Sequence, residues 1–539
     1  MVSSISGTSR AIFALCSLIA AQGGFAAAEA VQSDLEAAVQ NGFESAGPAQ
    51  SGFEGAGAAQ ADISACLNKA GVFVSVPTTS SWVLDTEAWN SRVSPKPSGV
   101  VFPKTEEQVT AALKCAASAG VKVTTLGGNR SFSSLGFGRN DGALVMNLKH
   151  MKNLKYDEST QLLSFGGPVM ISEAVNYLWK KYGRTLPHGR CPDVGMTGVV
   201  LSGFGTLSRE CGTMLDNLRS IRVALADGSI VDADANQNSD LFWGIRGATS
   251  SLGVVLVFKI KTFAPPSQRV TDYTIGFKSD IKPTQQDNVD ALIGMQNWAM
   301  SNDNNDLLSI RYNLRTNSTL QGFYYGSGAN AKLVLGSLMK KLPASMALIS
   351  NEEDFYASEN ISTPGIVEQT LTPRRYFYIT SVTIPEDTPL TNATAWSLFA
   401  NSAYAPKLPD AVVSGFVDMW GGKYTKRVRA DDSAWKHDNN LLLVRLDMRS
   451  SAFDVKFADS SLTTMRDRFY KFVDDYKVSG GVPGSFPTYR DDKLTVPEMA
   501  EYLYGGGNYQ KLQTIKTKYD SMEMFNTDPQ AIPALKTTS

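Results

Sequence analysis

One cysteine and two glycine-rich turns bring together the residue types in this chain that are best suited to chemistry. Cys191 stands in the run Gly189–Gly195, between an arginine and a proline, and this pattern predicts a turn on a ligand-facing loop. The run Thr125–Phe132 supplies a turn whose glycines let the backbone approach a phosphate. Arg130 in that run could clamp a pyrophosphate, or it could bind an acidic group elsewhere in the site.

Tyr489, in the run Phe486–Asp492, is the candidate general base. A phenolate in a pocket can accept the proton of a hydroxyl group during oxidation of the carbon that carries it. An isolated tyrosine has a pKa of about 10, so this role requires a neighbouring cation, and Arg490 or Arg445 could supply it. The alternative is a Tyr-x-Asp triplet that merely caps a strand.

Polar residues in two strand-like runs are candidates for the substrate pocket. Arg445 and Asp447 alternate with apolar residues in Leu441–Met448, so both could face a pocket from one side of a strand. A solvated strand face would explain them equally well. Tyr378, in the run Tyr376–Thr383, is the third candidate.

The histidines and one further glycine run argue against other classes of site. His150, His188 and His437 are the only three histidines, and they lack the spacing of metal ligands or of a catalytic triad. The prediction is therefore no metal site, with each of the three histidines as a hydrogen-bonded core residue. The run Gly203–Ser208 lacks the third glycine and the later acidic residue of a nicotinamide-binding turn.

Length and charge define the broad class. The 539 residues are 43% hydrophobic, which is enough for two or more domains with large cores. The net charge of −1, without a run of Lys or Arg, argues against a nucleic-acid partner.

The first residues predict secretion. Residues 1–28 combine Arg10, an apolar run and small residues, which is the pattern of a signal peptide and is too short for a membrane span. Residues 29–61 contain an approximate repeat of small and polar residues and are predicted to be a low-complexity linker or pro-segment.

Hydrophobic patterning beyond the linker predicts an α+β fold in three sections. Residues 62–268 alternate short strands with helices such as Glu106–Ser118, whereas 269–480 contain longer helices, including Thr284–Met300 and Ser461–Tyr476. Strand-like runs in this second section include Leu308–Leu314. Residues 481–539 return to the style of the first section and are expected to pack back on it.

Several of these runs occur in the order found in a known family. The runs at Gly189–Gly195, Asp240–Gly247, Phe486–Asp492 and Gly506–Tyr509 resemble motifs of the berberine-bridge-enzyme-like and oligosaccharide-oxidase branch of the FAD-linked oxidases. The resemblance covers roughly residues 66–525. It implies an FAD-binding domain of the PCMH type (vanillyl-alcohol-oxidase type), which both chain ends build (62–268 and 481–539), with an inserted α+β substrate domain at 269–480.

The resemblance also implies roles for individual residues. Cys191 matches the cysteine that bonds to carbon 6 of the flavin ring, Val194 matches a small residue that admits oxygen, and Tyr489 matches the base. An unmodified buried cysteine remains the alternative for Cys191. The positions expected to contact FAD are Gly127, Gly128, Asn129, Arg130, Ser131, Cys191, Val194, Gly195, Gly198 and Asn508.

Departures from the family pattern cluster at the same site. Arg130 replaces the histidine that forms a second bond to the flavin, and a guanidinium cannot form that bond, so any covalent attachment is expected through Cys191 alone. Arg130 could instead stabilise negative charge on the reduced flavin. Asn129 replaces a glycine, Thr488 replaces an asparagine, and the loop Gly198–Gly205 is one residue shorter than the family pattern.

The remaining cysteines and the sequons fit a secreted protein. We expect a disulfide between Cys66 and Cys115, which the resemblance also implies, and which would be worth about 4 kcal/mol in the chain-entropy model. Cys211 is expected to be a small buried hydrophobe. Asn317, Asn360 and Asn392 begin possible glycosylation sequons.

The predicted function is therefore that of a secreted, monomeric FAD-dependent oxidase. It would take hydride from a hydroxylated or activated carbon of a small molecule, preferably a specialised metabolite, with O2 as acceptor. Arg246–Gly253 resembles the version of its motif in oligosaccharide oxidases, which are the alternative. A non-redox isomerase or cyclase, or a binding protein on the same fold, also remains open.

Overall fold

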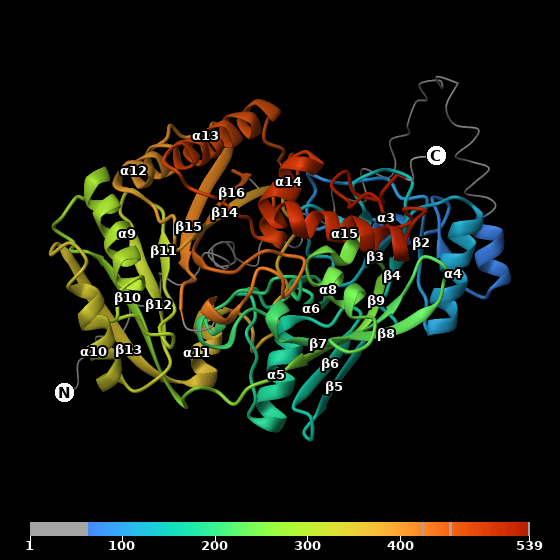
Figure 1. Cartoon of the computed structure of the whole chain (residues 1–539), viewed down its shortest axis with the longest axis horizontal. Helices are drawn as coiled ribbons and strands as arrows, with labels where there is room; N and C mark the ends of the chain where they lie inside the picture. Colours follow the sequence, from blue (N-terminus) through green and yellow to red (C-terminus); the bar gives the residue numbers. More distant parts are fainter. Residues whose placement is uncertain (1–62, 423–424, 452–454, 537–539) are drawn as a thin grey trace, which may run out of the picture.

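The computed structural model describes residues 63–422, 425–451 and 455–536, and their strands form three sheets (Figure 1). The predicted signal peptide and the predicted linker therefore lie outside the described residues. The mixture of sheets and helices confirms the α+β class. No helix in the described ranges is long and apolar enough to span a membrane.

The first sheet has four strands in the order β1-β2-β4-β3. Strands β2, β4 and β3 are parallel, and β1 joins the edge in the antiparallel direction. The helix α4 (Glu106–Ser118) has the predicted bounds. Thr105 is its N-cap, and the Thr105 hydroxyl accepts a hydrogen bond from the Gln108 N–H. The strand bounds are β1 (Val74–Ser75), β2 (Gly99–Val101), β3 (Val123–Leu126) and β4 (Leu144–Asn147).

The predicted disulfide joins the start of the described chain to this layer. Cys66 and Cys115 are bonded, with Cα atoms 5.8 Å apart, and Cys115 lies on the buried face of α4. Cys211 is buried, as predicted, and burial raises the pKa of its thiol to about 12.

The second sheet has five antiparallel strands in the order β5-β6-β9-β7-β8. Its strands are β5 (Asn153–Asp157), β6 (Leu162–Gly166), β7 (Leu218–Ala224), β8 (Ile230–Asp234) and β9 (Val254–Lys261). The helices in this part of the chain are α5 (Ile171–Tyr182), α6 (Met196–Val199), α7 (Ser208–Cys211) and α8 (Ser239–Ala248).

The third sheet has seven antiparallel strands in the order β13-β10-β12-β11-β15-β16-β14. Its strands are β10 (Arg269–Phe277), β11 (Arg311–Asn313), β12 (Thr319–Tyr324), β13 (Met346–Asp354), β14 (Phe377–Pro385), β15 (Ala411–Met419) and β16 (Asn440–Ser450). Its helices are α9 (Gln285–Ala299), α10 (Gly328–Met339), α11 (Phe355–Ser362), α12 (Asn392–Ala400) and α13 (Asp459–Val478).

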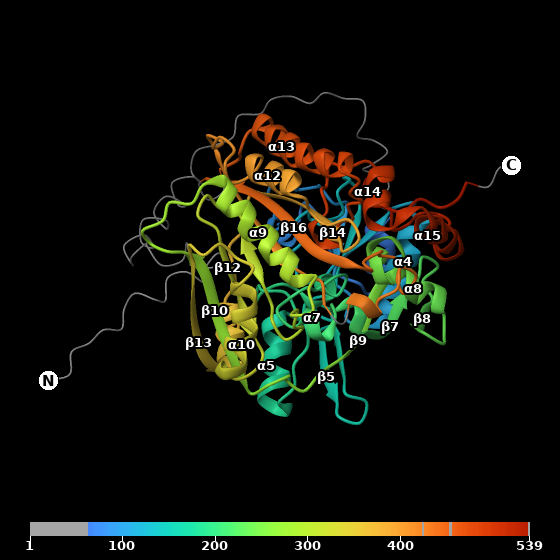
Figure 2. The same ribbon diagram turned by 60° about the vertical axis from the view of Figure 1, so that its left-hand side comes forward.

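Helices cover one face of the third sheet and leave the other face for the site. Helices α9, α12 and α13 lie together over one side of β14 and β16 (Figure 2), and their apolar residues form one core with the sheet. The opposite face is turned toward the first two sheets. The prediction of a strand at Leu308–Leu314 was too long, because only Arg311–Asn313 pairs with both neighbours.

The chain end returns to the first two sheets (Figure 1). The helix α15 (Gly505–Tyr519) packs on α8, and α14 (Val496–Leu503) precedes it. The Val123 N–H donates to the Met524 carbonyl at 2.9 Å, which ties this segment to β3. The segment between the third sheet and α14 contains a short 3-10 turn, Pro487–Tyr489, and therefore brings the candidate base to the junction of the sheets.

Candidate active site

Two loops of the FAD-binding region lie back to back. A Cβ atom on Gly128 would stand 2.5 Å from the Gly195 Cα, and one on Gly195 would stand 2.7 Å from the Gly128 Cα. Only glycine fits at both positions, which explains these two glycines. Beside Gly198 a Cβ would meet nothing within 4 Å, so open space adjoins this part of the loop.

The first loop has the form of an anion-binding turn. Asn129 has φ of 51°, in the left-handed region, and its side-chain amide donates to the Glu87 carbonyl at 2.9 Å. Within the described chain, the backbone N–H groups of Asn129, Ser131 and Phe132 donate to no backbone carbonyl. Such groups can bind phosphate, so the loop fits the pyrophosphate of FAD.

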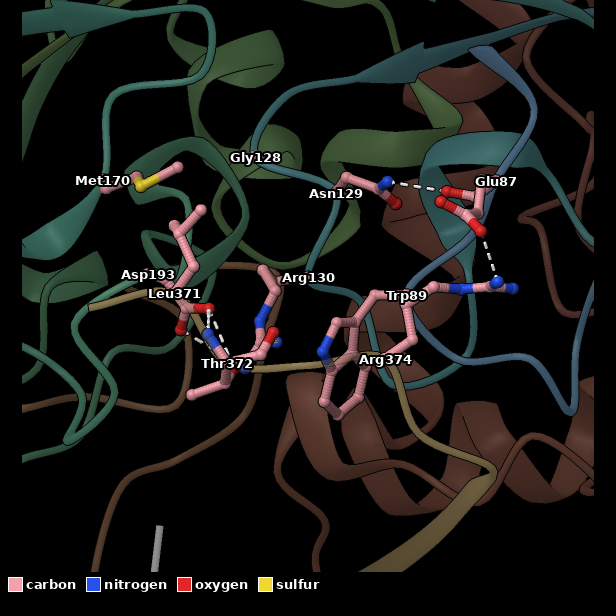
Figure 3. Close-up of a pocket in the computed structure, with 10 residues that line it drawn as sticks. All are labelled: Glu87, Trp89, Gly128, Asn129, Arg130, Met170, Asp193, Leu371, Thr372 and Arg374. Atoms are coloured by element: carbon pink, nitrogen blue, oxygen red, sulfur yellow. Dashed lines mark hydrogen bonds and ion pairs between the residues drawn. The ribbon is translucent and has the colours of Figure 1, made fainter. Parts of the chain in front are cut away.

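Arg130 is held by groups of the protein itself (Figure 3). Its Nη2 lies 3.3 Å from Asp193 Oδ1, its Nη1 donates to the Thr372 carbonyl at 3.3 Å, and its Cζ stacks 4.1 Å from the centre of the Trp89 ring. The second Asp193 oxygen accepts from the Thr372 N–H at 2.6 Å and from its hydroxyl at 2.8 Å. A cavity of about 190 Å³ adjoins this cluster.

This arrangement places Arg130 in a loop-to-loop contact. Asp193 lies two residues after Cys191, so the ion pair joins the phosphate-type turn to the cysteine loop. The charge of Arg130 is thereby balanced, and neither a pyrophosphate clamp nor an acidic substrate is needed to explain it.

Tyr489 lies among cations on the open face of the third sheet. The Cζ of Arg445 is 4.6 Å from the centre of the Tyr489 ring. Burial has the largest influence and leaves the pKa of Tyr489 above its usual value, although the positive charges of Arg445 and Arg311 oppose this rise. The predicted cation is thus Arg445 and not Arg490, which forms an ion pair with Asp528.

Strand register explains how these side chains come together. Arg311 on β11 is the direct partner of Asp418 on β15, and their side chains form two hydrogen bonds of 2.8 Å. Arg445 lies opposite Phe416 on β15, and its Nη2 is 3.1 Å from Asp447. These residues therefore occupy one face of the sheet.

The prediction for Tyr378 needs correction. Tyr378 is the neighbour of Phe377 and Ile379 on β14, and those two side chains cluster with Trp89 and Tyr489 on the site face. Successive side chains on a strand point to opposite faces, so Tyr378 lies in the core under α13. There, Asp491 and Arg466 are among the charges that act on its pKa, which burial raises strongly.

The other predicted residues occupy varied positions. Asn508 donates to the carbonyls of Ala430, Ser433 and Ala434 at 2.9, 3.3 and 3.2 Å, so it fixes that segment, and a contact with FAD stays a prediction. The Ser131 hydroxyl accepts from the Leu135 N–H at 3.1 Å. The Thr488 hydroxyl lies 3.0 Å from the Ser202 hydroxyl, which connects the shortened loop to the Tyr489 segment.

Cys191 and Val194 are half-buried on the second loop, and Cys191 is near enough to Tyr489 for its charge to affect the tyrosine pKa. His188 and His437 are core residues, as predicted, whereas the same prediction for His150 was wrong because its side chain is exposed. The Nε2 atoms of His188 and His437 lie 2.8 Å from Glu359 and 2.7 Å from Asp216, respectively. No cluster of metal-ligand residues occurs in the described ranges.

The comparisons with known proteins agree with this geometry. Residues 97–234 match the FAD binding domain model, and residues 485–533 match the model described as berberine and berberine like. A glucooligosaccharide oxidase from Sarocladium strictum is 30% identical over 86% of this chain and 93% of its own length. The chain belongs to the berberine-like family of FAD-binding oxidases. It is accordingly an FAD-linked oxidoreductase.

Solved structures of this family have the same fold. A chitooligosaccharide oxidase matches 88% of this chain and 100% of its own with a TM-score of 0.80 and 26% identity. A glucooligosaccharide oxidase from Acremonium strictum, described with a 6-S-cysteinyl, 8α-N1-histidyl FAD, matches 88% of this chain and 100% of its own with a TM-score of 0.77 and 26% identity. That Arg130 of the berberine-like chain replaces the second attachment residue of such enzymes stays a prediction from the resemblance.

Residues that sequence reasoning missed are Trp89, Thr372, Arg311 and Asp418. A signal for Arg311 was present, because Ser309, Arg311 and Asn313 alternate with the apolar residues of the same run. Trp89 and Thr372 lie in irregular segments without a repeating pattern.

Proposed function

We propose that this oxidase acts on a hydroxyl-bearing carbon of a small molecule, with Tyr489 as the general base. The observation that carries the proposal is the position of the Tyr489 ring 4.6 Å from the Arg445 guanidinium, whose charge, together with that of Arg311, opposes the rise in the Tyr489 pKa that burial causes. FAD, when bound, supplies the acceptor for the hydrogen and electron pair of the C–H bond. Tyr489 takes the hydroxyl proton, so an alcohol becomes a carbonyl compound, and O2 is reduced to H2O2.

Two charged groups act on the same proton transfer. The base must be a phenolate when substrate binds, and burial opposes that form. Arg445 and Arg311 favour it. The site therefore needs these arginines for its pKa as well as for packing.

The proposed attachment of FAD is a single thioether from Cys191 to carbon 6 of the flavin. The half-buried Cys191 side chain, the glycine contact between the two loops and the Arg130–Asp193 pair support it. A spectrum before and after acid precipitation tests this point. Colour that stays with the wild-type pellet but leaves the Cys191→Ala pellet supports the tether, and colour lost from both contradicts it.

The proposed substrate is a hydroxylated specialised metabolite, and oligosaccharides are the second candidate because the relatives named above oxidise them. Oxygen consumption and H2O2 formation should be measured with benzylic alcohols and with cellobiose, xylobiose and chitobiose. Loss of both signals in Tyr489→Phe, but not in the opposite-face control Tyr378→Phe, is the expected result. If the flavin-loaded Tyr489→Phe variant oxidises the benzylic alcohols and the disaccharides as fast as the wild type does, Tyr489 is not the base.

We further propose that the protein follows the secretory route. The Cys66–Cys115 disulfide supports this, since such bonds persist in oxidising compartments. Asn317 and Asn392 are exposed and could carry glycans, whereas the side-chain oxygen of Asn360 is buried. Intact-mass measurement of the natural protein, before and after glycosidase, tests both points.

A further inference from the structure

Arg190 differs from the other arginines of the site in its bonding. Within the described ranges, its guanidinium forms no hydrogen bond or ion pair, and its Nε is buried without a partner. The residue as a whole is half-buried, so its accessible surface lies away from Nε. Burial and, to a smaller extent, the positive charge of nearby Arg311 lower the pKa of Arg190 to about 10.

The charges around Arg190 leave an excess of one cation. Asp418 is the acidic group that most stabilises Arg190, but both of its oxygens are already bonded to Arg311. Arg445 has Asp447 at 3.1 Å. Three arginines on this side of Tyr489 thus face two aspartates, and a buried charge without an acid of its own is costly.

The position of this excess charge relates it to the reaction. Arg190 immediately precedes Cys191, and Tyr489 is among the groups that act on its pKa. Arg190 and Tyr489 are therefore close enough for their charges to interact, so a ligand bound at Arg190 would lie on the side of the site that holds the candidate base. The acid beside nearby His188 is Glu359, and its carboxylate already has the His188 ring as a partner at 2.8 Å.

We propose that Arg190 binds a carboxylate on the substrate, so that a hydroxy acid is oxidised in preference to the corresponding neutral alcohol. This inference rests on the proposed oxidation at Tyr489 and specifies its substrate class. A planar guanidinium with free donors matches a carboxylate with two parallel hydrogen bonds. Such a bond would fix the position of the hydroxyl-bearing carbon relative to Tyr489.

Binding can be measured without turnover, using flavin difference spectra of the FAD-loaded protein. The probes are two matched pairs, benzoate with benzamide and glucuronate with glucose. The variant is Arg190→Gln, which keeps hydrogen-bonding groups but removes the charge. The control is Arg429→Gln, whose side chain is 74% exposed.

At least one acid is expected to bind about 10- to 100-fold more tightly than its neutral partner, as hydrogen bonds to charged groups are worth this much. Arg190→Gln should abolish that preference, while Arg429→Gln should retain it. Equal affinities for acid and neutral probes in the wild type would overturn the inference. So would an Arg190→Gln variant that shifts the flavin reduction potential but keeps the acid preference, because Arg190 would then act on the cofactor.

A second arm separates this inference from the proposed reaction. Flavin reduction is measured without oxygen for 4-(hydroxymethyl)benzoate and its methyl ester. Faster reduction by the acid, lost in Arg190→Gln, is expected. Equal reduction by both compounds would keep the oxidation at Tyr489 and reject the carboxylate site, whereas tight acid binding without reduction by any alcohol would keep the site and reject the oxidation.

Discussion

The two active-site loops each carry an arginine, Arg130 on the first and Arg190 on the second, and the surroundings of the two side chains differ. Arg130 has an acidic partner, a carbonyl acceptor and an aromatic ring. Within the part of the chain that the structure describes, Arg190 has none of these, and Asp418, the carboxylate that acts on its pKa, is already bonded to Arg311. The difference indicates that a guanidinium whose charge the protein balances holds loops together, whereas one left unbalanced is available to a ligand.

The largest loss of activity should come from substitution of Tyr489, which lies beside the arginines that outnumber their acidic partners. Tyr489→Phe removes the group that accepts the proton, so kcat/KM should fall about 10²- to 10⁴-fold. Steady-state oxygen consumption measures this, and the amount of bound flavin should not change. A loss below tenfold would show that another group takes the proton and that the cluster around Arg445 serves binding alone.

Substitution of Arg130, whose charge is balanced by Asp193, should lower the stability of the protein. Arg130→Ala leaves the buried Asp193 without its cation, and breaking such a pair typically costs about 3 kcal/mol or more. Denaturant unfolding of the flavin-loaded protein measures the change. Arg130→Ala with Asp193→Asn should recover part of the loss, because no uncompensated charge is then buried.

The Arg130→Ala variant could also contradict the distinction drawn between Arg130 and Arg190. If Arg130→Ala leaves the unfolding midpoint unchanged but weakens binding of benzoate, Arg130 is a ligand-binding residue. Its contacts with Asp193 and Trp89 would then be incidental to its role.

The pH dependence of turnover should distinguish the charges that act on Tyr489. Arg445 lowers the pKa of Tyr489 and Asp418 raises it. The phenolate form increases as pH rises through that pKa, so the rising limb of the kcat profile reports it. Arg445→Gln should move the limb to higher pH, and Asp418→Asn should move it to lower pH.

The test is whether the two variants shift the rising limb of the pH profile in opposite directions. A limb that both variants move the same way, or that neither moves, would assign the titration to a group other than Tyr489. Thermal unfolding at each pH serves as the control, since both substitutions disturb buried ion pairs.

Local pattern predicted most of the fold. The helix Glu106–Ser118 has the same bounds in the structure, and the predicted helix Thr284–Met300 differs from α9 only in that its first and last residues are the caps. In both cases a threonine begins the helix and accepts a hydrogen bond from a backbone N–H, a signal that is local in sequence. Local signals of this kind do not depend on tertiary contacts.

The site was less predictable because its contacts cross long sequence distances. Asp418 meets Arg311 from a strand more than a hundred residues later, and no local pattern pairs them. Arg445 could be assigned to the pocket, since its strand alternates polar and apolar residues. Strand β14 gave no such signal, because eight of its nine residues are buried on one face or the other.

Tyr378 on β14 is the position where substitution should change activity least. Tyr378→Phe should leave kcat/KM within about twofold of wild type, since the side chain lies in the core under α13 and not with Tyr489. Loss of its hydroxyl near Asp491 should change the unfolding free energy by about 1 kcal/mol or less. A large loss of turnover with stability unchanged would mean that the two faces of β14 are assigned in the wrong sense. Arg445, which pairs with Ser381 across the same strand, would then also lie away from the site.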